Sequence, residues 1–113
     1  MKIQNVTIAG GGVLGSQIAY QCAYAGFHVT TYLRSEASIQ RAQPKVQRLH
    51  GIYQAELTAA KTQGGPVSRG LIFNGDPAAA DYDTLLRQAD AAFEHFHYET
   101  DLAAAVADAD LVI

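Results

Sequence analysis

The sequence predicts an α/β fold in which helices cover a parallel sheet and a helical hairpin is inserted after the second strand. Three observations support this fold class. Short β-branched runs alternate with segments whose apolar residues recur at helical spacing. The first strand, the first helix and the second strand fit within about 30 residues, and two long helical patterns follow before the next strand. Strands that alternate with helices in this way form parallel sheets joined by right-handed crossovers.

The first strand is expected over residues 3–9, whose β-branched residues suit a central strand. Three glycines break it, and a helix is predicted over residues 13–25 with Gly26 as its C-cap. A second β-branched strand should cover residues 27–33. The apolar residues that recur at helical spacing in the first helix are Val13, Leu14, Ile18, Ala19, Cys22 and Ala25.

Two further periodic segments predict the helical hairpin. Ser35 is a good N-cap, Glu36 suits the positive end of the helix dipole, and this helix should end at residues 64–66. Pro44 lies inside the pattern and predicts either a kink or a later helix start. The apolar positions are Ile39, Ala42, Val46, Leu49, Ile52, Tyr53, Leu57 and Ala60. The remaining elements are expected at residues 67–77 (loop), 79–93 (helix), 96–100 (strand), 102–107 (helix) and from 111 onward (strand).

The composition argues against several classes of function. The chain has a formal net charge of −3 and no basic tract, which argues against nucleic acid as a partner. Cys22 is the only cysteine, so neither an intrachain disulfide nor a cysteine-rich metal site can form. No apolar run approaches the ~20 residues of a membrane span, and the N-terminus lacks a signal-peptide pattern. We therefore expect a cytoplasmic protein with no membrane partner.

The length of the chain suits one domain, over residues 1–113. The C-terminal residues 109–113 begin like a buried strand and stop within an apolar run. Because an exposed apolar edge invites association, a natural domain seldom ends in this way. We therefore expect these residues to be part of a longer protein.

The loop after the first strand carries the most specific motif. It reads Gly10-Gly11-Gly12-Val13-Leu14-Gly15, which is the pattern G-x-G-x-x-G between a strand and a helix. In this setting Gly10 permits a tight turn, Gly12 lets the backbone approach a pyrophosphate, and Gly15 lets the helix pack closely on the strand. The N–H groups of Val13 and Leu14 would then face the anion. The motif predicts a Rossmann-type dinucleotide-binding domain, against the alternative of a turn that binds nothing.

The end of the second strand departs from the pattern of NAD-binding sites. Such sites place an Asp or Glu about 20 residues after the glycines, where it accepts hydrogen bonds from the ribose hydroxyls. Here that position holds Leu33, which cannot accept them, followed by Arg34 and Ser35. The Arg34 guanidinium suits a phosphate, and Ser35 adds a hydroxyl and a backbone N–H. Arg41 and Lys45 lie further along the next helix and would add positive potential.

Two interpretations of this departure stay open. In the first, the lost carboxylate and the added guanidinium move the preference from NAD toward NADP. In the second, Arg34 points to solvent or stacks on the adenine, and NAD binds with a weaker ribose contact. A charge-assisted phosphate contact contributes roughly 1.5–3 kcal/mol, so NADP is slightly favoured.

The chain resembles the N-terminal NAD-binding domain of the 3-hydroxyacyl-CoA dehydrogenase family. The resemblance covers nearly the whole chain and is most specific in the segment NVTIAGGGVLGSQIAYQCAYAGFHV. The hairpin after the second strand, the segment FHYETDL and the closing ADADLVI also match. The chain departs from the family at Leu33, where the family usually has aspartate.

This resemblance implies a reversible oxidation of a 3-hydroxyacyl-CoA to the 3-ketoacyl-CoA. In the family a histidine, held by a glutamate, takes the hydroxyl proton while the nicotinamide takes the hydride. Those catalytic residues lie beyond the point where this sequence stops, so no catalytic residue is assigned here. The hairpin contributes to the acyl-CoA cleft in the family, which makes Ser35, Lys45 and Lys61 conceivable contacts. The family's dimer contacts imply a homodimeric full-length protein.

The four histidines do not predict a metal site. His95 and His97 would share one face of the third strand, but two histidines alone do not complete a metal site, so a surface pair is expected. His28 opens a strand and His50 lies in the long helix. Cys22 falls on the apolar side of the first helix, where it should act as buried filler rather than as a reactive thiol.

Two alternative functions remain beside the acyl-CoA dehydrogenase. One is a dehydrogenase of another 3-hydroxy acid, of the gulonate or carnitine type. The other is a non-catalytic module that senses a dinucleotide and regulates a partner. A downstream histidine–glutamate pair and a helical dimerisation domain would favour an enzyme over the sensing module.

Overall fold

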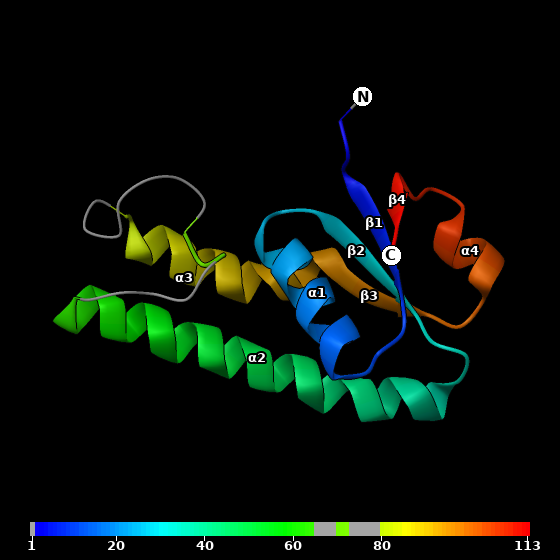
Figure 1. The fold of residues 1–113 in the computed structure, drawn as a ribbon, viewed down its shortest axis with the longest axis horizontal. Helices are drawn as coiled ribbons and strands as arrows, with labels where there is room; N and C mark the ends of the chain where they lie inside the picture. Colours follow the sequence, from blue (N-terminus) through cyan, green and yellow to red (C-terminus); the bar gives the residue numbers. More distant parts are fainter. Residues whose placement is uncertain (1, 65–69, 73–79) are drawn as a thin grey trace.

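The computed structural model describes residues 2–64, 70–72 and 80–113 (Figure 1). These residues form a sheet of β1 (Asn5–Ala9), β2 (His28–Tyr32), β3 (Phe96–Glu99) and β4 (Leu111–Val112). The strands are all parallel and lie in the order β3-β2-β1-β4. The helices are α1 (Val13–Tyr24), α2 (Glu36–Gln63), α3 (Tyr82–Ala91) and α4 (Leu102–Val106), with a 3-10 turn, η2, at Ala92–His95. The predicted α/β class, with its Rossmann-type parallel sheet and its helical hairpin after the second strand, is confirmed.

The sheet lies between two layers of helix. On β1, Val6 and Ile8 belong to the main core together with residues of α1. The hydroxyl of Thr7, which lies between them, donates a hydrogen bond to the carbonyl of Ala105 in α4 at 2.6 Å. Since neighbouring side chains of a strand point to opposite faces, α1 and α4 cover opposite sides of the sheet.

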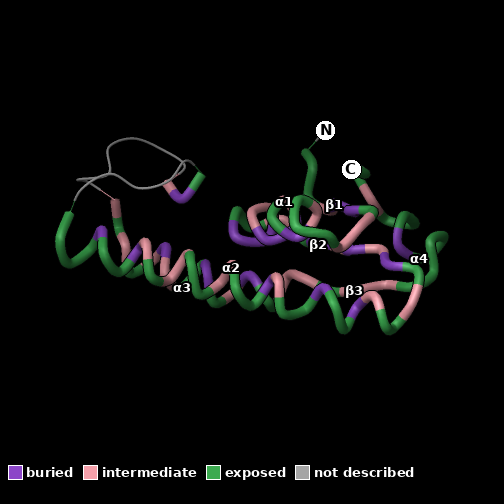
Figure 2. Tube along the Cα trace, turned by 60° about the horizontal axis from the view of Figure 1, so that its bottom comes forward, coloured by how far each residue is buried: buried purple, intermediate pink, exposed green. Residues whose placement is uncertain are grey.

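An aromatic cluster joins α1 to the helical hairpin of α2 and α3, which lie side by side in Figures 1 and 2. The Tyr53 ring of α2 packs edge-on against Tyr20 and Tyr24 of α1, with ring centroids 4.7 and 5.2 Å away. The Tyr20 hydroxyl donates to the carbonyl of Ala89 in α3, and Tyr24 donates to the carbonyl of Leu71, both at 2.7 Å. These buried hydroxyls therefore have hydrogen-bond partners, and the cluster holds the hairpin against α1.

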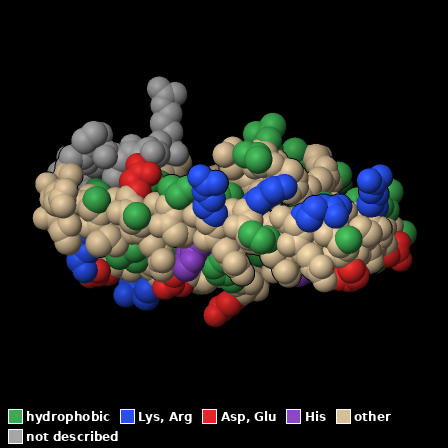
Figure 3. Space-filling view, turned by 90° about the horizontal axis from the view of Figure 1, so that it is seen from below, with side chains coloured by type: hydrophobic (Ala, Val, Ile, Leu, Met, Phe, Trp, Pro, Cys, Tyr) green, Lys and Arg blue, Asp and Glu red, His purple; other side chains and the backbone are tan. Residues whose placement is uncertain are grey.

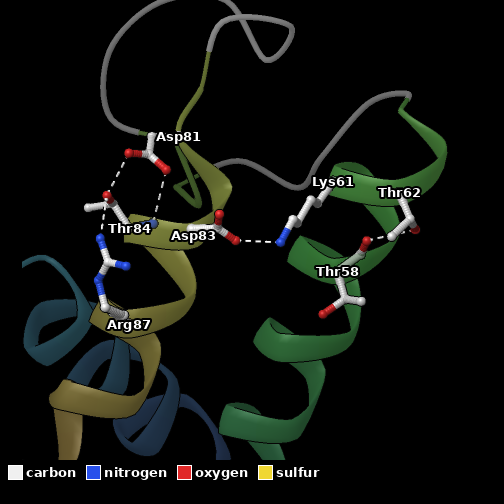
Figure 4. Close-up of polar contacts among 7 residues, drawn as sticks. All are labelled: Thr58, Lys61, Thr62, Asp81, Asp83, Thr84 and Arg87. Carbon is white, nitrogen blue, oxygen red and sulfur yellow. Dashed lines mark hydrogen bonds and ion pairs between the residues drawn. The ribbon is translucent and has the colours of Figure 1, made fainter.

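Polar contacts lie at the C-terminal end of α2 and the N-terminal end of α3 (Figure 4). Asp81 caps α3 by accepting from the N–H of Thr84, and its other carboxylate oxygen accepts from the Thr84 hydroxyl at 2.7 Å. Lys61 of α2 pairs with Asp83 of α3 at 2.5 Å. Both partners of this ion pair are exposed, so it contributes at most about 1 kcal/mol and mainly orients the two helices.

The face of α1 that is buried differs from the expected one. Val13 and Leu14 are 67% and 68% exposed, although both were expected on the apolar side. The residues of α1 that are buried are Ser16, Ala19, Tyr20, Ala23 and Tyr24. The first turn of α1 lies beside the glycine loop, and its Val13 lines an open cavity between α1 and α2 instead of packing in the core. The core begins one turn later.

Of the two alternatives predicted from Pro44, the later helix start is wrong, because α2 begins at Glu36 and continues through the proline. Proline removes the hydrogen bond to the carbonyl four residues earlier, which belongs to Gln40. Pro44 and Gln40 are both exposed, so water can satisfy that carbonyl. Although α2 has 28 residues, no helix in the described part of the chain combines the length and the apolar character that a membrane crossing requires.

Several boundaries shift by one or two residues. Strand β1 starts at Asn5 rather than at residue 3, and β2 loses one residue at each end of the expected range. The C-cap of α1 is Ala25, and Gly26 follows it with a φ of +101°, the left-handed conformation for which glycine is suited. The start expected for the second hairpin helix and most of the predicted loop, residues 67–69 and 73–77, lie outside the described residues.

Replacing Tyr24 with phenylalanine should change how stability depends on pH. Burial raises the pKa of Tyr24 to about 12, above the ordinary value of about 10 that the unfolded chain has. The free energy of unfolding of the wild type should therefore be unaffected by this group below pH ~10 and should fall as the pH rises from about 10 to 12. Tyr24→Phe removes this titration but leaves the Leu71 carbonyl without its donor.

We expect Tyr24→Phe to lose about 1–2 kcal/mol at pH 7 and to show a shallower decline above pH ~10 in urea unfolding. The decline should be reduced rather than abolished, because burial also raises the pKa values of Tyr20 and Tyr53. Identical slopes for the variant and the wild type between pH ~10 and ~12 would show that Tyr24 does not titrate with unfolding.

Candidate dinucleotide-binding site

The glycine loop lies at the carboxyl end of β1, where the strand order changes direction. Strand β1 has β2 on one side and β4 on the other. The helix that leads from β1 to β2 and the helix that leads from β3 to β4 lie on opposite faces of the sheet. Outside the carboxyl ends of such strands an open crevice forms, which is where α/β folds bind ligands.

The structure gives a physical reason for two of the glycines. Gly10 has a φ of +132°, in the left-handed region that side-chain-bearing residues rarely adopt. A Cβ atom on Gly15 would lie 2.6 Å from the Gly10 carbonyl oxygen, so α1 and the end of β1 approach more closely than any side chain permits. The turn and the close packing predicted for these two positions are therefore present.

Gly11 and Gly12 face opposite environments. A Cβ atom on Gly11 would lie 2.8 Å from Leu33 Cδ2 and 3.0 Å from Ala42 Cβ, so this residue packs directly against the start of α2. A Cβ atom on Gly12 would meet nothing within 4 Å. The loop is thus supported on one side and open on the other, and Gly12 is on the open side.

The N-terminus of α1 has no capping side chain among the described residues. Its N-cap is Gly12, whereas α2, α3 and α4 have side-chain caps from Ser35, Asp81 and Asp101. The first N–H groups of a helix have no partner within the helix. Those of Gly12, Val13 and Leu14 are therefore available to an anion at the positive end of the helix dipole.

Leu33 does not face the crevice. Its side chain is 8% exposed and packs with Ile39 and Ala42 in a small core cluster against which Tyr98 also packs. The side chain thus lies behind the glycine loop, and only its backbone stands at the position where a ribose-binding carboxylate is expected. A leucine at this place supports the loop rather than contacting a ribose hydroxyl.

Arg34 is exposed, whereas Ser35 is already engaged. The Ser35 hydroxyl accepts a hydrogen bond from the N–H of Ser38 at 3.2 Å and shares another with the Ser38 hydroxyl at 3.1 Å. The Arg41 guanidinium donates to the same Ser38 hydroxyl at 3.0 Å. Two arginines and two serine hydroxyls therefore lie at the start of α2. Of the two arginines, Arg34 is the one close to the end of β2.

Basic side chains extend along α2 on the face shown in Figure 3. Lys45 and Arg48 line a cavity of about 240 Å³ between α2 and the first half of α1. The other residues that line it are Val13, Ser16, Gln17, Leu49 and Ile52. Of the three conceivable substrate contacts, Lys45 lies here, Ser35 caps α2 and Lys61 pairs with Asp83. The structure does not bring these three residues together.

Ser16 was not predicted as a site residue from the sequence. This residue is buried in the first turn of α1 and donates from its hydroxyl to the Gly11 carbonyl at 3.2 Å. Its position directly after the last glycine of the motif was an available signal, because a side chain in the first turn can reach back into the preceding loop. Lys45 also donates to the Gly11 carbonyl, at 3.3 Å, and no local pattern predicts this contact between residues 34 positions apart.

No cluster of three or more potential metal ligands occurs among the described residues. His95 and His97 do not share a strand face, because His95 belongs to the turn η2, and its ring packs edge-on against His28 at 5.1 Å. His97 is exposed and lies 3.2 Å from the Thr30 hydroxyl. Cys22 is half-buried, and burial raises the pKa of its thiol, which makes it a poor nucleophile.

Comparison with known proteins identifies the family. The model of the 3-hydroxyacyl-CoA dehydrogenase, NAD binding domain, matches residues 5–113. The chain belongs to this family. No match was found among curated protein sequences.

Solved structures agree with this membership. A diketoreductase is 37% identical with a TM-score of 0.67, and the match covers 99% of this chain and 31% of that one. FadB2 from M. tuberculosis is 25% identical with a TM-score of 0.65, covering 99% and 30%. A 3-hydroxybutyryl-CoA dehydrogenase from Escherichia coli K12 is 23% identical with a TM-score of 0.58, covering 99% and 18%, and supports the fold alone. This member of the family therefore spans about a third or less of the solved chains that it matches.

Substituting Gly15 tests the close approach of α1 to β1. In Gly15→Ala the new Cβ would lie 2.6 Å from a backbone carbonyl oxygen, which cannot rotate away as a side chain can. We expect a loss of about 1–3 kcal/mol in the free energy of unfolding, measured in urea. Gly51→Ala is the matched control, because a Cβ at Gly51 meets nothing within 4 Å. Equal stability of the two variants would contradict the packing role of Gly15.

Proposed function

We propose that this chain is the cofactor-binding part of an NAD(P)-dependent dehydrogenase that interconverts 3-hydroxyacyl-CoA and 3-ketoacyl-CoA. The observation that carries the proposal is that α1 has no side-chain cap at its N-terminus, where the N-cap residue Gly12 borders open space. Family membership over residues 5–113 supports the same function. We take residues 1–113 as one dinucleotide-binding domain on this basis.

The residues present fit a dinucleotide. The proposed cofactor-binding residues are Gly10, Gly11, Gly12, Val13, Leu14, Gly15, Leu33, Arg34 and Ser35. The N–H groups at the start of α1 would hold the diphosphate, and Gly12 leaves room for it because its missing side chain faces open space. Leu33 contributes by packing behind the loop.

When bound, the nicotinamide cofactor supplies the acceptor or donor of a hydride. The residues of this chain bind and orient the cofactor and take no part in moving the substrate proton. We assign them no catalytic role, so the purified chain should bind NADH weakly and catalyse no turnover. Measured oxidation of a 3-hydroxyacyl-CoA by these 113 residues would contradict this division of roles.

Gly12→Ala separates cofactor binding from folding. Because a Cβ at Gly12 meets nothing within 4 Å, the variant should fold with at most about 1 kcal/mol lost from a poorer N-cap. The methyl group would occupy space that the diphosphate needs, at a cost of roughly 1–3 kcal/mol, which is about a five-fold to 150-fold loss of NADH affinity.

The measurement is a fluorescence titration with NADH, beside urea unfolding of the same samples. Gly51→Ala, on the exposed surface of α2, should keep the wild-type affinity. If Gly12→Ala binds NADH as tightly as the wild type, the diphosphate does not lie on this loop and the proposed site is wrong.

We further propose that the cofactor preference leans toward NADP. No carboxylate occupies the position of Leu33, and Arg34 is exposed at the end of β2, beside the start of α2. The guanidinium of Arg41, at 3.0 Å from the Ser38 hydroxyl, adds positive charge to the same corner. These features suit a 2′-phosphate, whereas the family model describes an NAD binding domain.

Arg34→Ala tests this preference. Loss of a charge-assisted phosphate contact should weaken NADPH binding by roughly ten-fold and NADH binding much less. Arg87→Ala is the charge-matched control, since Arg87 lies on α3 and donates to Thr84. An unchanged ratio of NADPH to NADH affinity in Arg34→Ala would assign Arg34 no role toward the phosphate.

A second candidate is a reductase of a dicarbonyl compound rather than of a CoA ester. The 37% identity to a diketoreductase favours it. Assays of the full-length protein with acetoacetyl-CoA and with a free diketone distinguish the two. We also propose a homodimeric, cytoplasmic full-length enzyme, which sedimentation and cell fractionation would test.

A further inference from the structure

The carbonyl of Gly11 receives two hydrogen bonds from different helices. The Ser16 hydroxyl of α1 donates at 3.2 Å, and the Lys45 ammonium of α2 donates at 3.3 Å. Ser16 is buried and Lys45 is half-buried, so both donors lie within the packed region between α1 and α2. Among the described residues, these two are the side chains that bond the backbone of the glycine loop.

These two bonds determine the direction of the next amide. The carbonyl of Gly11 and the N–H of Gly12 belong to one planar trans peptide unit, so they point in opposite directions. Because the carbonyl is held toward Ser16 and Lys45, the Gly12 N–H must point away from the packed side of the loop. Gly12 is also the glycine whose missing side chain faces open space.

The glycines on either side cannot hold this peptide by themselves. Glycine populates both signs of φ with little penalty, so a run of three glycines has many accessible peptide orientations. Gly11 packs against Leu33 and Ala42, which restricts where its Cα atom lies but leaves the following peptide plane free to rotate. The two side-chain donors remove that freedom.

We propose that Lys45 is a positioning residue for the nucleotide diphosphate, acting through the Gly11–Gly12 peptide. This inference rests on the proposed function and extends it to a residue outside the glycine motif. Lys45 holds the Gly11 carbonyl on the α2 side of the loop, and Ser16 holds it from α1. The Gly12 N–H is thereby presented to the diphosphate before the nucleotide arrives, which lowers the entropic cost of binding.

The test uses Lys45→Met, which keeps the length of the side chain and removes the donor. We expect its affinity for ADP to fall by roughly five-fold, measured by competition with NADH. Its affinity for adenosine 2′-monophosphate, which carries no diphosphate, should stay within about two-fold of the wild type. Lys45→Arg retains a donor and should recover most of the ADP affinity.

Arg48→Met is the matched control. Arg48 lines the same cavity and carries the same charge, but it makes no hydrogen bond or ion pair with the described residues. If Arg48→Met lowers the ADP affinity as much as Lys45→Met does, the effect is one of overall charge and the inference is wrong. Equal losses for ADP and for adenosine 2′-monophosphate in Lys45→Met would likewise overturn it, because they would indicate general damage to the site.

A nucleotide-free measurement separates this inference from the proposed function. Loss of a donor should move the carbonyl carbon resonance of Gly11 upfield in Lys45→Met and leave it in place in Arg48→Met. If the Gly11 resonance does not move in Lys45→Met, the inference is wrong, regardless of the nucleotide affinities. A wild-type chain that binds no nucleotide overturns the proposed function and this inference with it, whereas normal ADP binding by Lys45→Met overturns the inference alone.

Discussion

The contact on which the rest of the site depends is that between Gly15 and the Gly10 carbonyl. A single added carbon at Gly15 would lie 2.6 Å from that oxygen, so the first turn of α1 rests directly on the end of β1. This approach points the start of α1 across the carboxyl edge of the sheet. The free N–H groups of the helix therefore lie at the crevice beside β1 and β4. A bulkier residue would move the helix and its dipole away from that position.

The helical hairpin supports the loop from behind. Leu33 and Ala42 fill the space against Gly11, and Lys45, one turn further along α2, reaches the carbonyl of the same residue. Further along, Tyr53 packs against Tyr20 and Tyr24, which holds α2 against α1. Most helical stability in proteins comes from packing of this kind rather than from helix propensity. The conformation of the glycine loop is therefore coupled to how α2 packs on α1.

Features that depend on neighbouring residues could be predicted from the sequence. Features that depend on how another helix or strand packs could not. The glycine spacing, the caps at Ser35 and Gly64 and the order of strands and helices were all readable. The exposure of Val13 and Leu14 was not, because helical periodicity identifies an apolar stripe but not where the neighbouring layer ends. His95 was placed on a strand, whereas it lies in the turn that precedes it, since element boundaries carry the weakest signal.

The sequence by itself determined the strand–helix–strand unit, the parallel sheet and the glycine loop, because β-branched runs, helical periodicity and glycine spacing act over a few neighbouring residues. Only the tertiary structure decided that Leu33 lies under the loop and that Ser16 and Lys45 hold the Gly11 carbonyl. Lys45 and Gly11 are 34 positions apart, and their contact depends on the distance and rotation at which two packed helices settle. Local patterns contain no information about that packing, so a contact of this kind becomes visible only when the helices are in place.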